Sequence, residues 1–594
     1  MSKYKSRSEV PEKYKWDLSD FYTNDKDFNK DIDIALDRIK KESKFKETLK
    51  DSNKLYEFLK YDEITECLVE NLYVYSFMKD DEELGKSINI NRKNKALDVI
   101  TKYSNMASFF NPELLSLSKE EYNKLFDNKD LLEYKFLLDE IYKDKDHTLS
   151  EDKEIIINEL ESAMNNFDDI SSNLLNNEHN YGEVEIDGKK EEIHSTNFRM
   201  LMKNKNPKIR EEVSLKYKEV LDRYGGTSAS LLNGYAKANI ANAKIHNFKN
   251  AWDRKLFDYN MPEEAYNCLV KTVEDNLKSL HKFYSLYKIP YNLDKVHTYD
   301  LYLDLATSNK KYTIEEGIEL IRKAITPLGE EYMKCFNRII DNHYIDFCEY
   351  KGKTSGGYSI NTPDHDSRIL LSFNDDLSSV STIAHECGHN VHHQFVKKNN
   401  PIQYRNITTL VAEVVSLTNE CLLSSYLSEN GTKEEKIEGI SNILEVIDAN
   451  LFNAVREGKM ESDFYKYIEE GNALTKDYMN KLNLESIKKF YGKDVVIDKY
   501  AETGWIRRSH YYMNYYLYNY AFCISVALSN ASKILSGDKK QLERYINFIS
   551  LGSDIYPIDA FKVLGYDLKD KIVYEDAIQY FDKLVDKYIE ISKE

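Results

Sequence analysis

The sequence contains few of the residues that interrupt helices, and its cysteines form no recognisable pair. Nine prolines and 21 glycines occur in 594 residues, and few of them interrupt the helical patterns of the first 180 residues. The seven cysteines are scattered, odd in number and without a C-x-x-C pair. We therefore expect a helical protein with reduced thiols, which is typical of the cytoplasm.

Further absences narrow the class of protein. The chain has no run of 18 apolar residues, which argues against a transmembrane helix. Its first residues, M-S-K-Y-K-S-R-S-E, lack the apolar core of a signal peptide. The net charge is −18 and no basic stripe stands out, which argues against a nucleic-acid partner. These features predict a cytoplasmic globular protein with no membrane or nucleic-acid partner, and they leave its oligomeric state open.

Two features occur among the predicted helices: a β-hairpin and a pair of glycines. Apolar and polar residues alternate around Asp187-Gly188, which predicts a β-hairpin over 180–193. An amphipathic helix is predicted over 207–224, and we expect Gly225-Gly226 to end it.

The strongest chemical signal is the stretch 381–393, which reads S-T-I-A-H-E-C-G-H-N-V-H-H. His385 and His389 are one helical turn apart and therefore lie on the same face of a helix. Two imidazoles in this arrangement can bind one metal ion, and the carboxylate of Glu386 can reach a water on that metal. A strand predicted over 368–373 precedes the helix. The pattern predicts a zinc peptidase.

A catalytic zinc site needs a third protein ligand, and two candidates follow the histidine pair. His392 shares their face, but its Cα lies about 10.5 Å along the helix axis from that of His385, too far for both rings to bind one ion. Glu413 lies in a later, mostly apolar helical stretch, where an unpaired carboxylate is costly and a metal removes that cost. We therefore expect the ligands to be His385, His389 and Glu413. Glu420 is expected to hold the free nitrogen of a ligating histidine, the alternative being an ordinary surface glutamate.

With H-E-C-G-H and the later E-V-V-S, the chain resembles the thimet-oligopeptidase family of zinc metallopeptidases. Other segments favour its bacterial branch, oligoendopeptidase F, and the resemblance runs nearly end to end. The segments that carry it are Arg7–Pro11, Tyr14–Asp20, Asn206–Arg210, Trp505–Tyr512 and Gly552–Pro557.

This resemblance implies a fold and a substrate class. We expect a mainly α-helical, two-lobed zincin-type metallopeptidase, with a deep substrate channel and a small β element next to the H-E-x-x-H helix. The N-terminal helical lobe is placed at residues 1–200 and the catalytic zinc-peptidase domain at 201–594. The implied cofactor is one Zn²⁺ per chain, and the implied partners are oligopeptide substrates.

Two segments before the zinc helix are expected to contact the substrate. If the strand over 368–373 lies at an exposed sheet edge, it can pair with an extended peptide through backbone hydrogen bonds. The glycine-rich loop over 351–359 corresponds to a loop that borders the active site in the family. We expect it to close over the substrate, with Gly357 and Tyr358 in contact with it; the alternative is a plain connector.

A second chemical centre is predicted where a histidine precedes a dense run of tyrosines over 510–520. In the family, a histidine and tyrosines of this region stabilise the oxyanion of the tetrahedral intermediate, a task that suits a buried phenol. His510 matches directly. The tyrosine match is ambiguous: we favour Tyr518, then Tyr515, as catalytic groups, and place Tyr511 at the substrate.

Together these patterns predict a zinc metalloendopeptidase that hydrolyses internal bonds of short oligopeptides. A metal-activated water attacks the scissile carbonyl, with Glu386 as the general base. One alternative is a metallo-exopeptidase, either a carboxypeptidase or a dipeptidase. The other is a catalytically silent protein that binds peptides.

Overall fold

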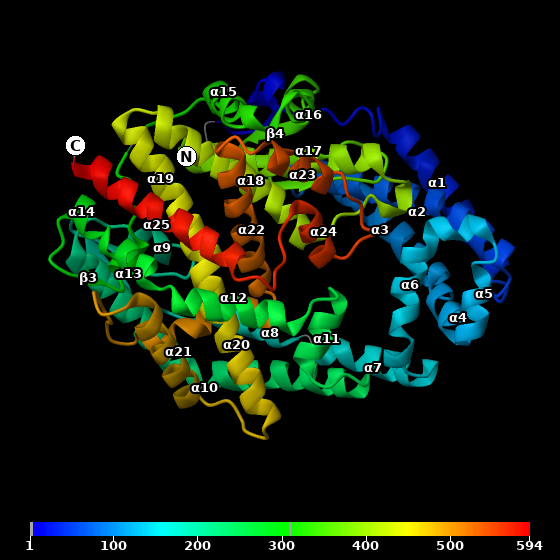
Figure 1. Cartoon of the computed structure of the whole chain (residues 1–594), viewed down its shortest axis with the longest axis horizontal. Coiled ribbons are helices and arrows are strands. Elements are labelled where there is room, and N and C mark those ends of the chain that lie inside the picture. The colour runs from blue at the N-terminus through cyan, green and yellow to red at the C-terminus, as the bar shows by residue number, and fades with distance from the viewer. Residues whose placement is uncertain (1–3, 165, 309, 594) are drawn as a thin grey trace. The chain divides into compact units, whose positions relative to one another are not determined.

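The computed structural model describes residues 4–164, 166–308 and 310–593. Most of them are helical (Figure 1), which confirms the predicted mainly α fold. The chain forms two compact units, each built from three segments. The first comprises residues up to 146, 310–423 and 533–564, and the second comprises 147–309, 424–532 and 565–594. None of these boundaries lies near residue 200. The division into two domains that we expected at residue 200 therefore stays a prediction.

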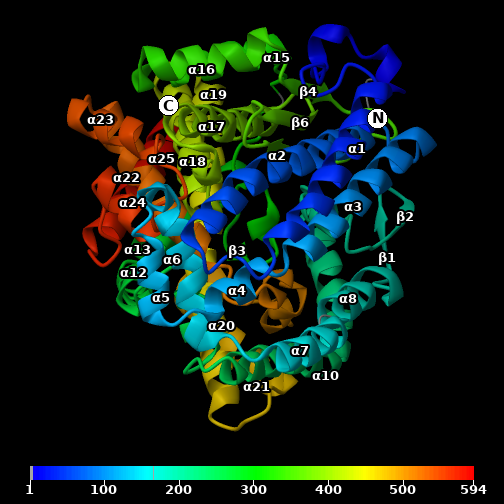
Figure 2. The same ribbon diagram turned by 90° about the vertical axis from the view of Figure 1, so that its right-hand side faces the viewer.

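Three long helices pack side by side in the first unit (Figure 2): α1 (Asp25–Glu42), α2 (Ser52–Glu82) and α3 (Ser87–Ala107). Asn24 and Asp51 cap α1 and α2 by accepting hydrogen bonds from their first free amides. The described part of this unit also contains α4 (Phe110–Ser116), α5 (Lys119–Leu125), α6 (Lys135–Lys143), α15 (Ile314–Ala324), α16 (Glu330–Asp341), α23 (Lys539–Phe548) and α24 (Pro557–Leu564).

A three-stranded sheet in the first unit leads into the helix that carries the metal-binding pattern. Its strands are β4 (Ile345–Cys348), β5 (Tyr358–Ile360) and β6 (Arg368–Phe373), in the order β4-β6-β5. The strand predicted over 368–373 is therefore present but central, and the prediction that it forms an exposed edge is wrong. The edge strand on that side is β5. After β6, α17 (Leu377–Asn399) begins at the cap Asp376, and α18 (Thr409–Asn430) follows.

The second unit confirms the predicted hairpin and corrects the predicted helix end. β1 (Glu183–Ile186) and β2 (Lys189–Glu192) are antiparallel, and Asp187 and Gly188 both adopt the positive φ of a tight hairpin turn. Helix α10 (Pro207–Ile245), however, continues through Gly225-Gly226. A Cβ at Gly225 would lie 3.0 Å from the side chain of Lys476, so close tertiary packing explains this glycine.

A π-helical turn over Asp448–Asn453 joins α19 (Lys433–Ile447) to α20 (Ala454–Glu469) in the second unit. Two 3-10 turns, Ala501–Arg507 and Ser509–Tyr512, precede α22 (Tyr518–Leu535). The unit also contains α7 (Glu151–Met164), α8 (Asn166–Asn173), α9 (Phe198–Met202), α11 (Ala251–Asp258), α12 (Glu263–Asp275), α13 (Lys278–Ser285), α14 (Lys288–Tyr291), α21 (Lys476–Tyr491), α25 (Ile572–Lys593), β3 (Val296–His297) and β7 (Val495–Val496).

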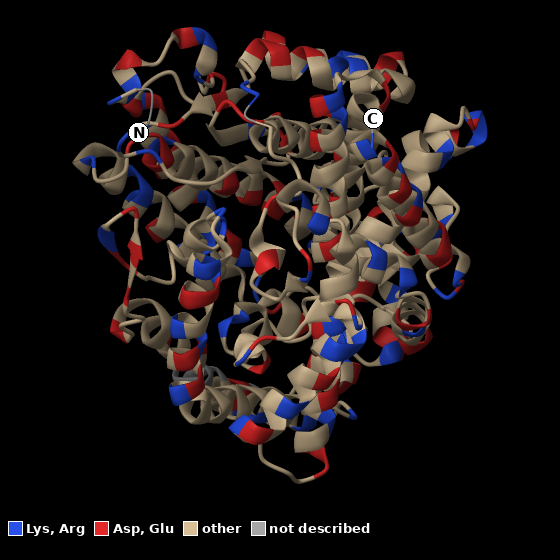
Figure 3. Cartoon of the chain, turned by 90° about the vertical axis from the view of Figure 1, so that its left-hand side faces the viewer, with Lys and Arg blue, Asp and Glu red and all other residues tan. Residues whose placement is uncertain are grey.

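Acidic and basic residues are interspersed along the helices drawn in Figure 3. Within the described residues, none of the helices combines the length and the apolar character needed to span a bilayer.

Candidate functional site

Helices α17 and α18 bring the three predicted metal ligands together. The Nε2 atoms of His385 and His389 are 3.2 Å apart. Glu413 approaches them from α18, with Oε2 at 3.5 Å from the Nε2 of His385 and Oε1 at 3.8 Å from that of His389. Among the described residues, these three form the group of histidine, cysteine and acidic side chains whose geometry suits a metal ion.

Gly388 permits the close approach of the two helices that this cluster requires. A Cβ at this position would lie 2.8 Å from the Cα of Ser416 on α18, well inside van der Waals contact. Beside it, the Asn419 side chain donates a hydrogen bond to the carbonyl of Ala384 and accepts one from the hydroxyl of Tyr332, at 2.9 and 2.8 Å. The sequence analysis missed this role, although a glycine between two ligands on a packed helix was a usable signal.

Glu420 determines which nitrogen of His385 faces the cluster. Its Oε1 lies 2.7 Å from the Nδ1 of His385, and its Oε2 accepts a hydrogen bond of 3.0 Å from the hydroxyl of Ser381. An ionised carboxylate only accepts hydrogen bonds, so Nδ1 carries the proton and Nε2 is directed toward His389 and Glu413. The hydroxyl of Ser416 donates to Glu413 at 2.9 Å and holds that carboxylate in turn.

The surrounding charges favour a cation at the cluster. Burial lowers the pKa of His385, but its hydrogen bond with Glu420 and the charges of Glu420, Glu413 and Glu386 outweigh this and raise it to about 9. Burial, together with the charge of His385, lowers the pKa of His389 to about 4. A metal ion at the cluster therefore competes with a proton for His385. Two imidazole nitrogens and one carboxylate, with an oriented His385, are a donor set that fits zinc.

Glu386 is 7% exposed and lies next to the edge strand β5. Burial raises its pKa to about 7, against the charge of His385 and a hydrogen bond from the main chain of Ser359. The predicted base and the edge of the sheet are therefore adjacent within the first unit.

The predicted substrate residue Tyr358 is engaged within the protein. Its hydroxyl donates to Asp81 at 2.8 Å, and the hydroxyl of Thr354 donates to the other oxygen of Asp81 at 2.6 Å. Gly357 faces Leu371 and Thr382, where a Cβ would lie 3.2 Å from either side chain. Gly357 also lines a cavity of about 500 Å³ at the end of β6, together with Gly356, Leu371, Phe373 and Thr382. Of the two predicted contacts, Gly357 therefore has the free surface.

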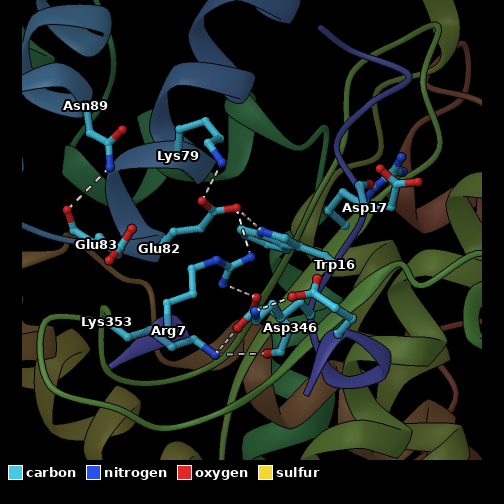
Figure 4. A network of polar contacts seen from close by, with 12 residues as sticks. Arg7, Trp16, Asp17, Lys79, Glu82, Glu83, Asn89, Asp346 and Lys353 are labelled. Carbon is cyan, nitrogen blue, oxygen red and sulfur yellow. Dashed lines mark hydrogen bonds and ion pairs between the residues drawn. The ribbon is translucent and has the colours of Figure 1, made fainter. Parts of the chain in front are cut away.

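Lys353 anchors the start of the glycine-rich loop (Figure 4). Its ammonium group donates to Asp346 Oδ1 at 2.6 Å and to the carbonyls of Cys348 and Leu371 at 2.9 and 2.7 Å, and its side chain is 1% exposed. Arg7 from the N-terminal segment pairs with the other oxygen of Asp346. This network ties the start of the loop to β4 and β6.

His392 does not belong to the metal cluster. It is fully buried and its ring lies parallel to that of Phe548, with the ring centroids 6.4 Å apart. Neither ring nitrogen has a hydrogen-bond partner among the described residues. Its position agrees with the expectation that His392 is not a metal ligand.

His510 and the predicted tyrosines belong to the second unit, so their predicted role at the metal is taken up below as a proposal. Tyr511, Tyr515 and Tyr518 are 1%, 4% and 2% exposed. The rings that flank the half-buried His510 belong to Tyr516 and Tyr520, with centroids 6.2 and 5.9 Å from the imidazole. The sequence analysis did not single out these two. Tyr516 lies before α22 and Tyr520 lies in its first turn, so no regular helical spacing predicted this pair.

Comparisons with known proteins agree with this arrangement. The model of peptidase family M3 matches residues 200–580, and that of the oligopeptidase F N-terminal region matches residues 113–180. Oligopeptidase PepF of Bacillus subtilis is 31% identical over 98% of this chain and 88% of its own length. Group B oligopeptidase PepB of Streptococcus agalactiae is 28% identical over 97% of each chain.

A solved structure from Chlamydophila abortus has the same fold, with a TM-score of 0.91, 28% identity and 99% of each chain covered. With a family match over most of its length and full-length relatives, the chain belongs to peptidase family M3 and is a metallopeptidase.

Proposed function

We propose that this protein is a zinc-dependent endopeptidase that hydrolyses internal bonds of oligopeptides. The observation that carries the proposal is the cluster of His385, His389 and Glu413 with Glu386 beside it. Its full-length relatives are named oligopeptidases and oligoendopeptidases, and these names support the substrate class.

His385, His389 and Glu413 would hold the zinc ion, and Glu420 and Ser416 would keep two of these ligands oriented. When bound, zinc supplies a Lewis acid that lowers the pKa of water and polarises the scissile carbonyl. Glu386 takes the proton from the attacking water and passes it to the leaving amine. Its neighbour β5 is an edge strand. The main chain of Ser359 donates to Glu386, and the rest of this edge can pair with an extended peptide backbone regardless of its side chains.

His510 remains our proposed hydrogen-bond donor to the oxyanion. We choose the tyrosine that acts with it by how exposed each candidate side chain is. Tyr518 and Tyr515 were favoured from the sequence, but both are buried, and the Tyr518 hydroxyl has no hydrogen-bond partner among the described residues. Tyr516 and Tyr520 are half-buried and flank His510. We therefore propose that one of these two tyrosines donates a hydrogen bond to the oxyanion. Tyr511, Tyr515 and Tyr518 would support the segment over residues 510–520 by packing.

We also propose that the enzyme works in the cytoplasm. All seven cysteines are free thiols, which suits a reducing compartment.

Mass spectrometry of a pool of oligopeptides, with both ends blocked and a folded protein added, tests the proposed activity. Wild-type protein is expected to cut internal bonds of the peptides and to leave the folded protein intact, whereas Glu386→Gln leaves both intact. Cutting that requires a free C-terminus would show an exopeptidase instead. Internal cutting that persists at the wild-type rate in Glu386→Gln would contradict the assigned site.

A further inference from the structure

The second unit contains a polar chamber that the proposed mechanism does not use. Two cavities of about 420 and 310 Å³ share one wall, and each has the size of a small-ligand pocket. Helices α10, α20 and α21 contribute to their lining, and Figure 1 shows where these helices run. The residues that line both cavities are Lys218, Leu301, Tyr302, Asp448, Ala449, Asn453, Gly504 and Arg508.

Lys218 is the unusual member of this shared wall. The residue is 8% exposed, yet it forms no hydrogen bond or ion pair with any described residue. Lys218 lines both cavities, so the chamber is the polar environment around its ammonium group. A buried cation without a partner is costly, whereas the buried lysine of the first unit, Lys353, has four acceptors. A ligand that brings negative charge to Lys218 would remove this cost.

Arg508 adds a second cation to the same wall. One of its guanidinium nitrogens donates to Glu457 at 2.6 Å. The guanidinium group has five N–H donors in all, so others remain for a ligand in the chamber. Glu457 is shared with Arg456, whose guanidinium lies 2.7 Å from the same oxygen. Arg456 and Arg508 therefore share the single carboxylate of Glu457, and this part of the wall keeps a net positive charge.

Asp448 places the opposite charge in the chamber. It begins the π-helical turn Asp448–Asn453, and such turns are frequent at functional sites because they displace side chains from the regular helical positions. Its Oδ1 accepts from the hydroxyl of Tyr284 at 2.9 Å, and its Oδ2 accepts from Asn453 at 3.0 Å. Each oxygen keeps a free lone pair. Burial raises the pKa of Asp448 to about 7, so an ammonium group beside it would favour the ionised form.

The two signs of charge restrict the ligand class. Asp448 would repel a dianion, and Lys218 and Arg508 would repel a simple cation. We propose that the chamber binds a small zwitterion, a free α-amino acid or a dipeptide, whose carboxylate pairs with Lys218 and Arg508 and whose ammonium group pairs with Asp448. This site is formed by the second unit alone and does not depend on the proposed peptidase activity.

Isothermal titration calorimetry with L-alanyl-L-alanine tests the proposal. The full-length zinc-loaded protein carries Glu386→Gln, so that the probe stays intact. The free dipeptide is expected to bind at millimolar concentrations or below. Lys218→Met should weaken binding about 10- to 100-fold, as expected for the loss of a charged hydrogen-bond partner. The matched control is Lys237→Met, an exposed lysine on the same helix, which should leave the affinity unchanged.

Blocked probes test the two charges separately on the parent protein, without relying on the folding of a variant. The C-terminal amide and the N-acetyl form of the dipeptide should each bind at least about tenfold more weakly than the free form. Asp448→Asn should weaken the free dipeptide and the amide but leave the acetylated form unchanged. The proposal is overturned if the parent protein shows no binding, if the amide binds as well as the free dipeptide, or if Lys218→Met and Lys237→Met bind equally well. Binding at the metal cluster would give this last result.

Discussion

The metal cluster of the first unit and the tyrosine-rich loop of the second unit differ in how well their polar atoms are satisfied; this loop is taken as residues 510–520 and includes the first residues of α22. Around the cluster, Glu420 is held by Ser381, Glu413 by Ser416, and Asn419 by Tyr332. In the loop, buried oxygens of Asn514, Tyr518 and Asn519 have no hydrogen-bond partner among the described residues.

The loop also contains backbone strain. Asn514 and Tyr515 are consecutive residues with φ of 45° and 56°, and a bulky residue in this left-handed region costs on the order of 1–3 kcal/mol. Buried Glu461 supports the turn, because its carboxylate accepts the amide hydrogen of Tyr515 at 2.7 Å. The side chains around the metal cluster are therefore held in place by hydrogen bonds, whereas several buried polar groups of the tyrosine-rich loop have no hydrogen-bond partner among the described residues.

The largest effect is expected for Glu386→Gln, which keeps the shape of the side chain and removes the base. We expect kcat to fall about 10²- to 10⁴-fold while the bound metal is retained, since loss of general-base catalysis has this magnitude. Steady-state kinetics on an internally quenched peptide, with metal analysis of the same samples, measures both. Glu331→Gln, at an exposed site of the same unit, is the control and should keep wild-type kcat. A mutant with more than a few per cent of wild-type kcat would exclude Glu386 as the base.

Glu420→Ala tests whether the hydrogen bonds of Glu420 increase the affinity for the metal. Without Glu420, the Nδ1 proton of His385 is no longer fixed, and we expect metal affinity to fall about 10- to 100-fold. Competition with a chromophoric chelator measures this affinity. Glu429→Ala, an exposed position on the same helix, should bind metal as the wild type does. Equal affinities in the two variants would mean that Glu420 is an ordinary polar residue.

Two glycine substitutions compare the packing of the two units. Gly388→Ala places a methyl group 2.8 Å from the Cα of Ser416, and we expect it to destabilise the protein by about 1–3 kcal/mol and to weaken metal binding. Gly226→Ala, inside helix α10 with no atom within 4 Å of the added group, should stabilise it by about 0.4–1 kcal/mol. Urea unfolding gives both values. If Gly388→Ala behaved like Gly226→Ala, close approach of α17 and α18 would not be required.

The pH dependence of stability should have opposite signs at two buried groups. Burial lowers the pKa of His393 to about 4 and raises that of Glu461 to about 8. The unfolded chain binds more protons than the native His393 below pH 6.5, so this residue costs stability as pH falls from 6.5 to 4. The native Glu461 keeps a proton that the unfolded chain loses above pH 4.5, so it costs stability as pH rises from 4.5 to 8.

Urea unfolding of His393→Gln and Glu461→Gln between pH 5 and 8 measures these slopes. Relative to wild type, the first variant should gain stability toward acid and the second toward alkali, by up to about 1.4 kcal/mol per pH unit. The exposed control His194→Gln should show no such trend. A flat difference at either position would mean that the group is less buried in solution than in this structure.

The sequence predicted which side chains come together where the pattern is local. The spacing of His385 and His389 follows from one helical turn, Glu413 was proposed because a carboxylate in an apolar helix needs a partner, and the structure brings the three side chains together. The family resemblance and the mainly α fold were likewise readable from the chain.

The errors concern contacts between distant residues. The central position of β6 depends on its pairing with both β4 and β5, which no local pattern encodes. Gly225 lies inside α10, where the side chain of Lys476 packs against it. Tyr516 follows a left-handed turn at Asn514 and Tyr515, a conformation that the side chains do not predict.

The measurement that tests the central claim most directly is the zinc content of Glu413→Gln and His392→Gln after dialysis, determined by plasma mass spectrometry alongside wild type. The structure places Glu413 at the two histidines and His392 in the core against Phe548. We predict that wild type and His392→Gln each retain one zinc ion per chain and that Glu413→Gln loses it. Zinc retained by Glu413→Gln and lost by His392→Gln would contradict the assignment of the third ligand and, with it, the site described above.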